Sequence, residues 1–235
     1  MAEEDTLQKL RTSPSDDADV EVEREEDAPA GRSEIAGSPI GEELDAQTRA
    51  RRDAALRHVR KLGDPVLRAS AVAVDRFDDA LKAEIERMGE LMSDALGVGL
   101  AATQLGILHR VLVYRAHADD PITALVNPVI EWRSDELEAA DEGCLSIPGV
   151  HVEVERPARI RARGADASGE ELLIEAEGLE ARVIQHEVDH LDGILILDRI
   201  SREARREAMR RAREAREGAT APARARVAES DAAPA

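Results

Sequence analysis

The segment LEARVIQHEVDHL, residues 179–191, predicts an amphipathic helix with two histidines four positions apart. Its apolar residues recur at helical spacing, and they are Val183, Ile184, Val188 and Leu191. His186 and His190 then share one face with Cβ atoms about 5–6 Å apart, so both imidazoles can bind one metal ion. Glu187 is turned by about 100° from His186, which keeps its carboxylate off the metal but within reach of a water there. The segment therefore predicts a metal-dependent catalytic site with Glu187 as general acid and base.

Two histidines need at least one further protein ligand, and the residues alone leave its source open. A third histidine three residues after Gly193 would complete a common metalloprotease pattern, but Ile196 stands there. Glu203 or Glu207 would give a zinc metallopeptidase, although an Arg-rich segment is a poor place for a cation site. Cys144 is the other candidate because a bound cation deprotonates a thiol, yet a lone cysteine near apolar residues is more often core.

A glycine-containing segment, GVGLAATQ at residues 97–104, superficially matches a dinucleotide-binding fingerprint. That fingerprint follows a strand and opens a helix, whereas this segment follows a predicted helix. We therefore interpret residues 97–104 as a tight loop.

Hydrophobic patterning predicts an α+β fold. Helical composition or periodicity marks residues 46–61, 79–96, 179–191 and 201–217, and aliphatic runs mark strands at 110–114, 123–126, 150–154, 160–163 and 172–176. Asp166–Gly169 predicts a hairpin turn, and Pro157 a connector between strands. We expect antiparallel sheets that flank a central metal-binding helix.

Charge is distributed unevenly along the chain. The formal net charge is −18, and residues 1–50 contribute −10 of it, with 15 Asp or Glu against 5 Lys or Arg. Residues 1–45 lack hydrophobic periodicity, so we expect a disordered acidic extension there. A catalytic domain over residues 46–200, a C-terminal helix over 201–217 and a flexible tail over 218–235 are expected to follow.

The composition also excludes several classes of protein. An acidic chain is unsuited to DNA binding, and no apolar run approaches the length that spans a membrane. The chain begins with an acidic stretch instead of a signal peptide, and its one cysteine forms no internal disulfide. We expect a cytoplasmic protein.

Three motifs occur in order along the chain: GVGLAATQ at 97–104, EGCLS at 142–146 and HEVDH at 186–190. Together with GDPVLR at 63–68 they resemble the signature motifs of peptide deformylases, over roughly residues 55–200. The resemblance implies that Cys144 completes the metal site with His186 and His190. It also implies Fe²⁺ as the physiological ion, with Zn²⁺, Ni²⁺ or Co²⁺ able to replace it.

Members of that family remove the N-formyl group from the initiator methionine of new bacterial proteins and release formate. The resemblance therefore implies nascent N-formyl-methionyl peptides as substrates, and the side-chain amide of Gln104 and the backbone N–H of Leu145 as oxyanion donors. It further implies substrate contacts from Val98, Gly99, Glu142, Leu179 and Val183. For Glu142 the alternative is a supporting role, in which it contacts a metal ligand instead of the substrate.

The Arg-rich segment at the C-terminal end suggests one further partner. Residues 199–217 hold 8 Arg against 4 Glu, a net charge of +4. The resemblance implies that such a helix can contact the ribosome, which a positive charge favours. A catalytically idle relative that only binds metal or peptide is a further alternative, but the intact Glu187 and Gln104 argue against it.

Overall fold

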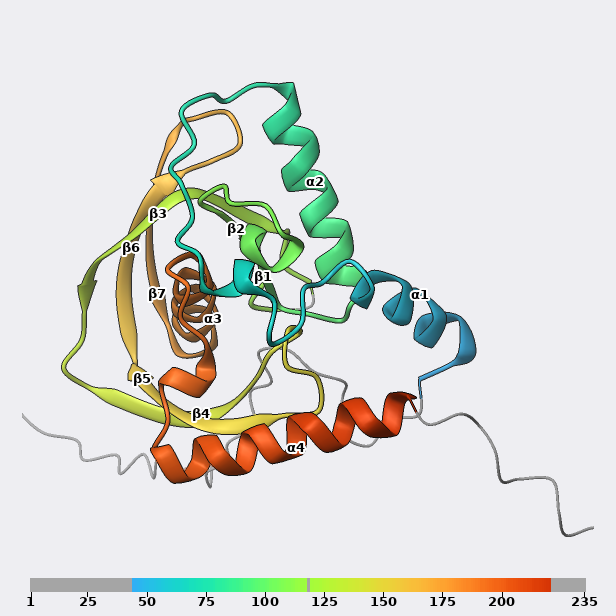
Figure 1. Ribbon diagram of the computed structural model, residues 1–235. Helices are drawn as coiled ribbons and strands as arrows, with labels where there is room; N and C mark the ends of the chain where they lie inside the picture. The colour runs from blue at the N-terminus through green and yellow to red at the C-terminus, as the bar shows by residue number, and fades with distance from the viewer. Residues whose placement is uncertain (1–43, 118, 221–235) are drawn as a thin grey trace, which may run out of the picture. The chain divides into compact units, whose positions relative to one another are not determined.

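The computed structural model describes residues 44–117 and 119–220 (Figure 1). The predicted acidic extension, residues 1–45, and the predicted tail, residues 218–235, lie almost wholly outside these ranges. Asp45 is described, and its carboxylate accepts hydrogen bonds from the N–H groups of Gln47 and Thr48. It therefore caps the first helix.

The strands of the described residues form two antiparallel sheets. The larger sheet has the order β1-β2-β3-β6-β7, with bounds Gly99–Ala101, Val111–Tyr114, Thr123–Arg133, Arg159–Ala165 and Glu171–Glu177. The smaller sheet pairs β4 (Leu137–Gly143) with β5 (His151–Pro157). Its register places Gly143 opposite His151, so Cys144 follows directly from the end of β4.

The α-helices are α1 (Ala46–Leu56), α2 (Asp79–Asp94), α3 (Gly178–Leu191) and α4 (Arg202–Thr220). Shorter 3-10 turns are η1 (Pro65–Arg68), η2 (Ala102–Leu105) and η3 (Ile196–Asp198). In Figure 1 the long strands β3, β6 and β7 curve around α3, while α4 lies along the outside of β4 and β5. No helix within the described ranges is long and apolar enough to cross a membrane.

The larger sheet is covered on both faces, as the side chains of β2 show. Val111 and Val113 pack in the apolar cluster that contains the buried residues of α2. Leu112 and Tyr114 point to the other face and pack in the cluster that contains those of α3. Burial on both faces explains why this strand reads as an unbroken apolar run.

Helix α3 is the most enclosed element of the fold. Every residue from Ala181 to Leu191 is buried, including the polar side chains that the sequence places on its second face. Buried polar groups must find partners or cost free energy. The polar face of α3 therefore lies inside the protein, where its groups need hydrogen bonds or a ligand.

The observed elements confirm the α+β class, and several of their bounds differ from the prediction. Residues 99–101 form β1 instead of a loop, because they pair with β2 at one edge of the larger sheet. Strand β4 was not predicted, since three of its 7 residues are acidic and only its last two are buried. Pro157 is the last residue of β5, and only Ala158 separates it from the start of β6. Helix α1 ends at Leu56, and α4 runs to Thr220.

Candidate metal centre

Helix α3 and the end of β4 bring one thiol and two imidazoles together. His186 and His190 lie one turn apart on α3, with ring centroids 5.0 Å apart. The Sγ atom of Cys144 lies 3.2 Å from Nε2 of His190. One ligand atom from each of the three residues lies within 4.8 Å of the other two, and all three side chains are buried.

These three side chains fit a bound transition-metal ion. Atoms that coordinate one ion at about 2.0–2.3 Å lie about 3–4 Å from one another, which matches the sulfur–nitrogen separation here. Burial lowers the pKa of His190 well below its usual value, whereas contacts with Cys144 and Glu142 outweigh burial and raise the pKa of His186 well above its usual value. A metal ion would require both imidazoles to be neutral. A thiolate with two imidazoles suits iron, zinc, nickel or cobalt, so the ligand set does not choose among them.

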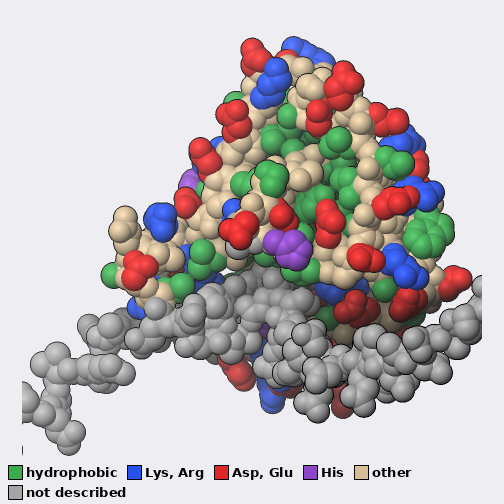
Figure 2. Space-filling view, turned by 180° about the vertical axis from the view of Figure 1, so that it is seen from behind, with side chains coloured by type: hydrophobic (Ala, Val, Ile, Leu, Met, Phe, Trp, Pro, Cys, Tyr) green, Lys and Arg blue, Asp and Glu red, His purple; other side chains and the backbone are tan. Residues whose placement is uncertain are grey.

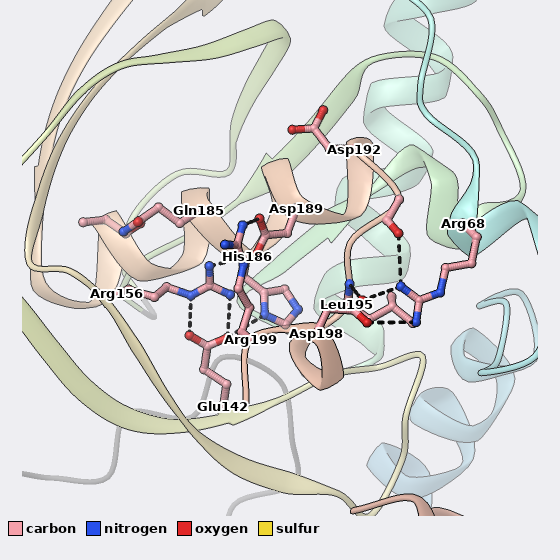
Figure 3. Close-up of polar contacts among 12 residues, drawn as sticks. Arg68, Glu142, Arg156, Gln185, His186, Asp189, Asp192, Leu195, Asp198 and Arg199 are labelled. Carbon is pink, nitrogen blue, oxygen red and sulfur yellow. Dashed lines mark hydrogen bonds and ion pairs between the residues drawn. The ribbon is translucent and has the colours of Figure 1, made fainter. Parts of the chain in front are cut away.

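Glu142 orients the first histidine from behind. One of its carboxylate oxygens, Oε2, lies 3.0 Å from Nδ1 of His186, which leaves Nε2 of that ring for a metal. Arg156 of β5 donates to both oxygens of Glu142, at 2.6 and 2.9 Å (Figure 3). Burial alone would raise the pKa of Glu142, but the hydrogen bonds from Arg156 and His186 outweigh it and hold that pKa well below its usual range. Glu142 is therefore a buried carboxylate anion.

Arg156 links this carboxylate to a second one on α3. Its Nη1 donates to Oδ2 of Asp189 at 2.9 Å, and Nε of Arg199 donates to the same oxygen at 3.0 Å (Figure 3). Arg156 belongs to none of the three sequence motifs. Arg156 alternates along the strand in step with Val152 and Val154, so its side chain is expected to face inward with theirs. An arginine at an inward-facing position was the sign in the sequence that this residue has a buried role.

Glu187 follows His186 directly on α3, and one of its carboxylate oxygens is free of hydrogen bonds to the described residues. Its side chain is 2% exposed, and Oε2 has no hydrogen-bond partner among the described residues. Burial raises the pKa of Glu187 to about 7. A Cβ at Gly99 would lie 2.9 Å from Cδ of Glu187, so only glycine lets β1 approach this carboxylate. The first and third motifs of the sequence therefore meet here.

Gln104 brings a side-chain amide to the same place. Its Oε1 accepts a hydrogen bond from the N–H of Ala101 at 2.9 Å, which fixes the amide. Its Nε2 then points to Ser146 Oγ, at 3.3 Å, and to Cys144 Sγ, at 3.8 Å. Gln104 of the first motif therefore contacts Cys144 and Ser146 of the second motif.

Lys61, which belongs to none of the sequence motifs, holds the loop of the second motif. Nζ of Lys61 donates to the backbone carbonyl of Leu145 at 3.0 Å. The next residue, Leu62, donates its N–H to the carbonyl of Ser146 at 2.9 Å. Burial lowers the pKa of Lys61 to about 8. No pattern in the sequence joins Lys61 to residue 145.

The predicted apolar contacts lie on one side of α3. Val98 and Leu179 are partly buried and pack against the cluster that contains Val183, which is fully buried. Glu142, also predicted to contact substrate, is 0% exposed, and four hydrogen bonds occupy its two oxygens. Glu203 and Glu207 lie on α4, where Glu207 forms ion pairs with Arg210 and Arg211.

The fold and this cluster are those expected of one class of protein: an α+β hydrolase whose metal ion would be held on a buried helix. The family model of polypeptide deformylases matches residues 56–206, which is more than half of the chain. The chain belongs to the peptide deformylase family, and its enzyme class is that of a deformylase.

Named relatives and solved structures agree with this assignment. The chain is 44% identical over 160 residues to a peptide deformylase of Parafrankia sp. (strain EAN1pec), covering 68% of this chain and 87% of the relative. It is 51% identical over 142 residues to one of Thermotoga neapolitana, covering 60% of this chain and 85% of the relative. The crystal structure of a peptide deformylase from Legionella pneumophila matches with a TM-score of 0.66 and 36% identity, over 70% of this chain and 98% of that one. The crystal structure of a peptide deformylase from Synechococcus elongatus in complex with actinonin matches with a TM-score of 0.63 and 43% identity, over 65% of this chain and 85% of that one.

Proposed function

We propose that this deformylase hydrolyses the formyl amide at the N-terminal formyl-methionine of newly made proteins and releases formate. One observation carries the proposal: Cys144, His186 and His190 converge within 4.8 Å, and the free carboxylate oxygen of Glu187 belongs to the residue next to His186. A metal-dependent amide hydrolase needs this combination of metal ligands and a general base.

Cys144, His186 and His190 would hold one divalent ion, and Fe²⁺ is the ion we propose. The bound ion supplies Lewis-acid activation of water and of the formyl oxygen. Glu142 keeps His186 in the tautomer and orientation that a ligand requires, through the 3.0 Å contact with Nδ1. Of the two roles considered for Glu142, its complete burial favours this supporting one over substrate binding.

Glu187 moves the protons of the reaction. Its Oε2, which no described residue contacts with a hydrogen bond, takes a proton from the attacking water and later delivers it to the nitrogen that leaves. Gly99 makes room for this carboxylate against β1. The same close approach would let a substrate backbone pass beside β1 without a side chain in its way.

Gln104 and Leu145 stabilise the oxyanion that develops on the formyl oxygen. The Oε1 contact with Ala101 holds the Gln104 amide so that its Nε2 faces the metal ligands. Lys61 and Leu62 hold the backbone of residues 145 and 146, which orients the N–H of Leu145. Donors fixed before the reaction need no reorganisation in the transition state.

The methionine side chain would bind beside Val98, Leu179 and Val183. Val98 and Leu179 are partly exposed and can contact a ligand directly, while Val183 forms the floor beneath them. An apolar site on this side of α3 suits an unbranched thioether.

We also propose that the enzyme works in the cytoplasm and contacts the ribosome through α4. Arg202 and Arg206 lie one turn apart on that helix, and both are exposed. A positive helix surface of this kind favours contact with the phosphates of ribosomal RNA.

The experiment is formate release from an N-formyl-Met peptide by the full chain, prepared without oxygen and loaded with Fe²⁺ or Ni²⁺. We expect rapid release that stops on chelation. Cys144→Ala separates the alternatives, because it should abolish metal binding here and spare it in a metallopeptidase with a glutamate ligand. A folded, metal-loaded chain that releases no formate would instead indicate an idle relative.

A further inference from the structure

Arg182 joins the helix of the metal centre to both strands of the smaller sheet. Its Nη1 donates to Oε1 of Glu142 at 3.0 Å and to the backbone carbonyl of Val154 at 2.8 Å. Its Nη2 donates to the backbone carbonyl of Glu138 at 2.6 Å. The side chain is only 3% exposed, so one buried guanidinium spans α3, β4 and β5.

Neutralising Glu142 does not by itself explain this arginine. Arg156 already binds both oxygens of Glu142, and His186 contacts one of them. A second buried cation carries a desolvation cost, and replacing such charges with apolar groups often leaves stability unchanged. The two backbone carbonyls that Arg182 also binds point to a geometric role.

The candidate metal ligands lie on the two sides of the interface that Arg182 bridges. His186 follows Arg182 by one turn on α3, so the two side chains share a helix face. Cys144 follows Glu142 by two residues, directly after β4. Any change in the separation of α3 from β4 therefore changes the separation of the thiolate from the two imidazoles.

We propose that Arg182 is a positioning residue that sets the distance between Cys144 and the histidine pair, and thereby the geometry of the metal site. This inference rests on the proposed function, in which those three residues hold the metal. It adds that this geometry depends on a further contact between the helix and the strands, besides those of His186 with Glu142 and of Arg156 with Asp189.

The planar, forked shape of the guanidinium, more than its charge, sets the distance between Cys144 and the two histidines. Three acceptors from two strands surround Arg182, and a planar group with five fixed donors can reach them together. A lysine at the same place keeps the charge but cannot hold three acceptors in that plane. R182K therefore separates charge from geometry, and R182M removes both.

The test uses the full chain loaded with Co²⁺, because the cobalt spectrum reports thiolate ligation and coordination geometry without turnover. We expect R182K and R182M to shift the thiolate-to-cobalt and d–d bands, and to weaken Co²⁺ binding about 10–100-fold in competition with a chelator. The variant R182K should behave like R182M. After Co²⁺ loading, kcat for formate release should fall more than KM rises.

Two control variants separate positioning from loss of stability. Leu81→Ala opens a cavity beneath α2, in an apolar cluster that contains none of the three candidate ligands. Arg161→Met removes an exposed ion pair with Glu175. Both controls should keep the wild-type cobalt spectrum, even where the melting temperature falls.

Two results would overturn the inference. If R182K and R182M keep the wild-type spectrum and Co²⁺ affinity while melting lower, as Leu81→Ala should, then Arg182 only stabilises the fold. If the wild-type chain itself shows no thiolate-to-cobalt band, the proposed ligation by Cys144 is wrong and the inference falls with it.

Discussion

At the scale of single residues, Glu187 and its surroundings show how the fold prepares a base. The carboxylate is buried, one of its oxygens has no partner among residues 44–117 and 119–220, and the backbone of Gly99 closes over it. A free oxygen that is already desolvated can exchange protons with a substrate without first breaking a hydrogen bond. Within the described ranges, the Glu187 oxygen left unsatisfied is therefore the one that the proposed reaction would use.

Glu187→Ala tests this role directly. We expect formate release to fall by about 10²–10⁴-fold or more, because the variant lacks its proton acceptor. Metal content, measured by elemental analysis, should stay at the wild-type value, since Glu187 is not one of the three converging side chains. The control is Asp192→Ala, an exposed carboxylate at the end of α3 that should leave turnover unchanged. Wild-type turnover in Glu187→Ala would refute the assignment.

Tyr114 offers a second test, because it is the one tyrosine of the chain. Burial and the hydrogen bond from its hydroxyl to Glu180 raise the pKa of Tyr114 well above its usual value. Above a pH of about 10 the unfolded chain loses the phenol proton while the folded chain keeps it. The free energy of unfolding should therefore fall as pH rises beyond that point.

The measurement is phenolate absorbance in the near ultraviolet, combined with denaturant unfolding at several pH values. Tyr114→Phe should remove this component of the pH dependence while keeping the apolar contacts of the ring. Ionisation of Tyr114 at its ordinary pKa in the folded protein would contradict the prediction.

At the scale of elements, α3 and α4 divide the two proposed roles. Helix α3 is buried and carries the candidate site, whereas α4 packs on β5 and η3 through Ala208 and Ala212. The other residues of α4 up to Ala215 are largely exposed and Arg-rich. Ribosome contact and chemistry can therefore be changed independently.

Reversal of the charges on α4 tests that separation. The double variant R202E/R206E should cosediment less with ribosomes, and its lower affinity should be most evident at low salt, because phosphate contacts are salt-dependent. Formate release from a free peptide should stay unchanged. A matched control reverses the exposed Arg133 and Arg161 on the larger sheet. Equal cosedimentation of both double variants would remove the support for a specific role of α4.

At the scale of the whole molecule, the proposed metal centre joins segments that are distant along the chain. Cys144 lies 46 positions from His190, and the surrounding bonds connect α3 with the smaller sheet. A ligand that binds only the folded chain stabilises it by mass action. The bound metal should therefore stabilise both the helix and the sheet.

Removal of the metal tests this coupling. With free metal at about 1,000 times its Kd, binding adds about 4 kcal/mol to the free energy of unfolding, which chelation should remove. Differential scanning calorimetry of loaded and chelated protein measures the loss. Cys144→Ala should melt at the same temperature with or without chelator. A chelator-independent midpoint in the wild type would show that the metal does not link the two parts.

Deletion of residues 1–43 tests the proposed boundary of the catalytic domain. The family model begins at residue 56, and the described part begins just before the capping residue Asp45. We expect kcat/KM for formate release and the melting temperature to match those of the full chain. Loss of either would place part of the acidic segment within the working enzyme.

Much of this protein was predictable from local sequence. The α+β class, helix α3 and the family followed from periodicity and from three short motifs, because 3.6-residue spacing alone places His186 and His190 on one face. The ligand set and the role of each site residue stay predictions, supported by the distances among them. Cys144 is the clearest intermediate case, since only its motif marked it and only the fold placed it beside His190.

The tertiary structure decided which side chains support the site. Arg182 meets Glu142 across 40 positions, and Lys61 meets the carbonyl of Leu145 across 84. No local pattern encodes such contacts, because they depend on how the curved sheet and the β4–β5 pair enclose α3. Burial then determines the role of such a side chain. In a polar strand or helix an arginine is ordinarily a solvated surface group, whereas beside a buried carboxylate it must hold a defined position.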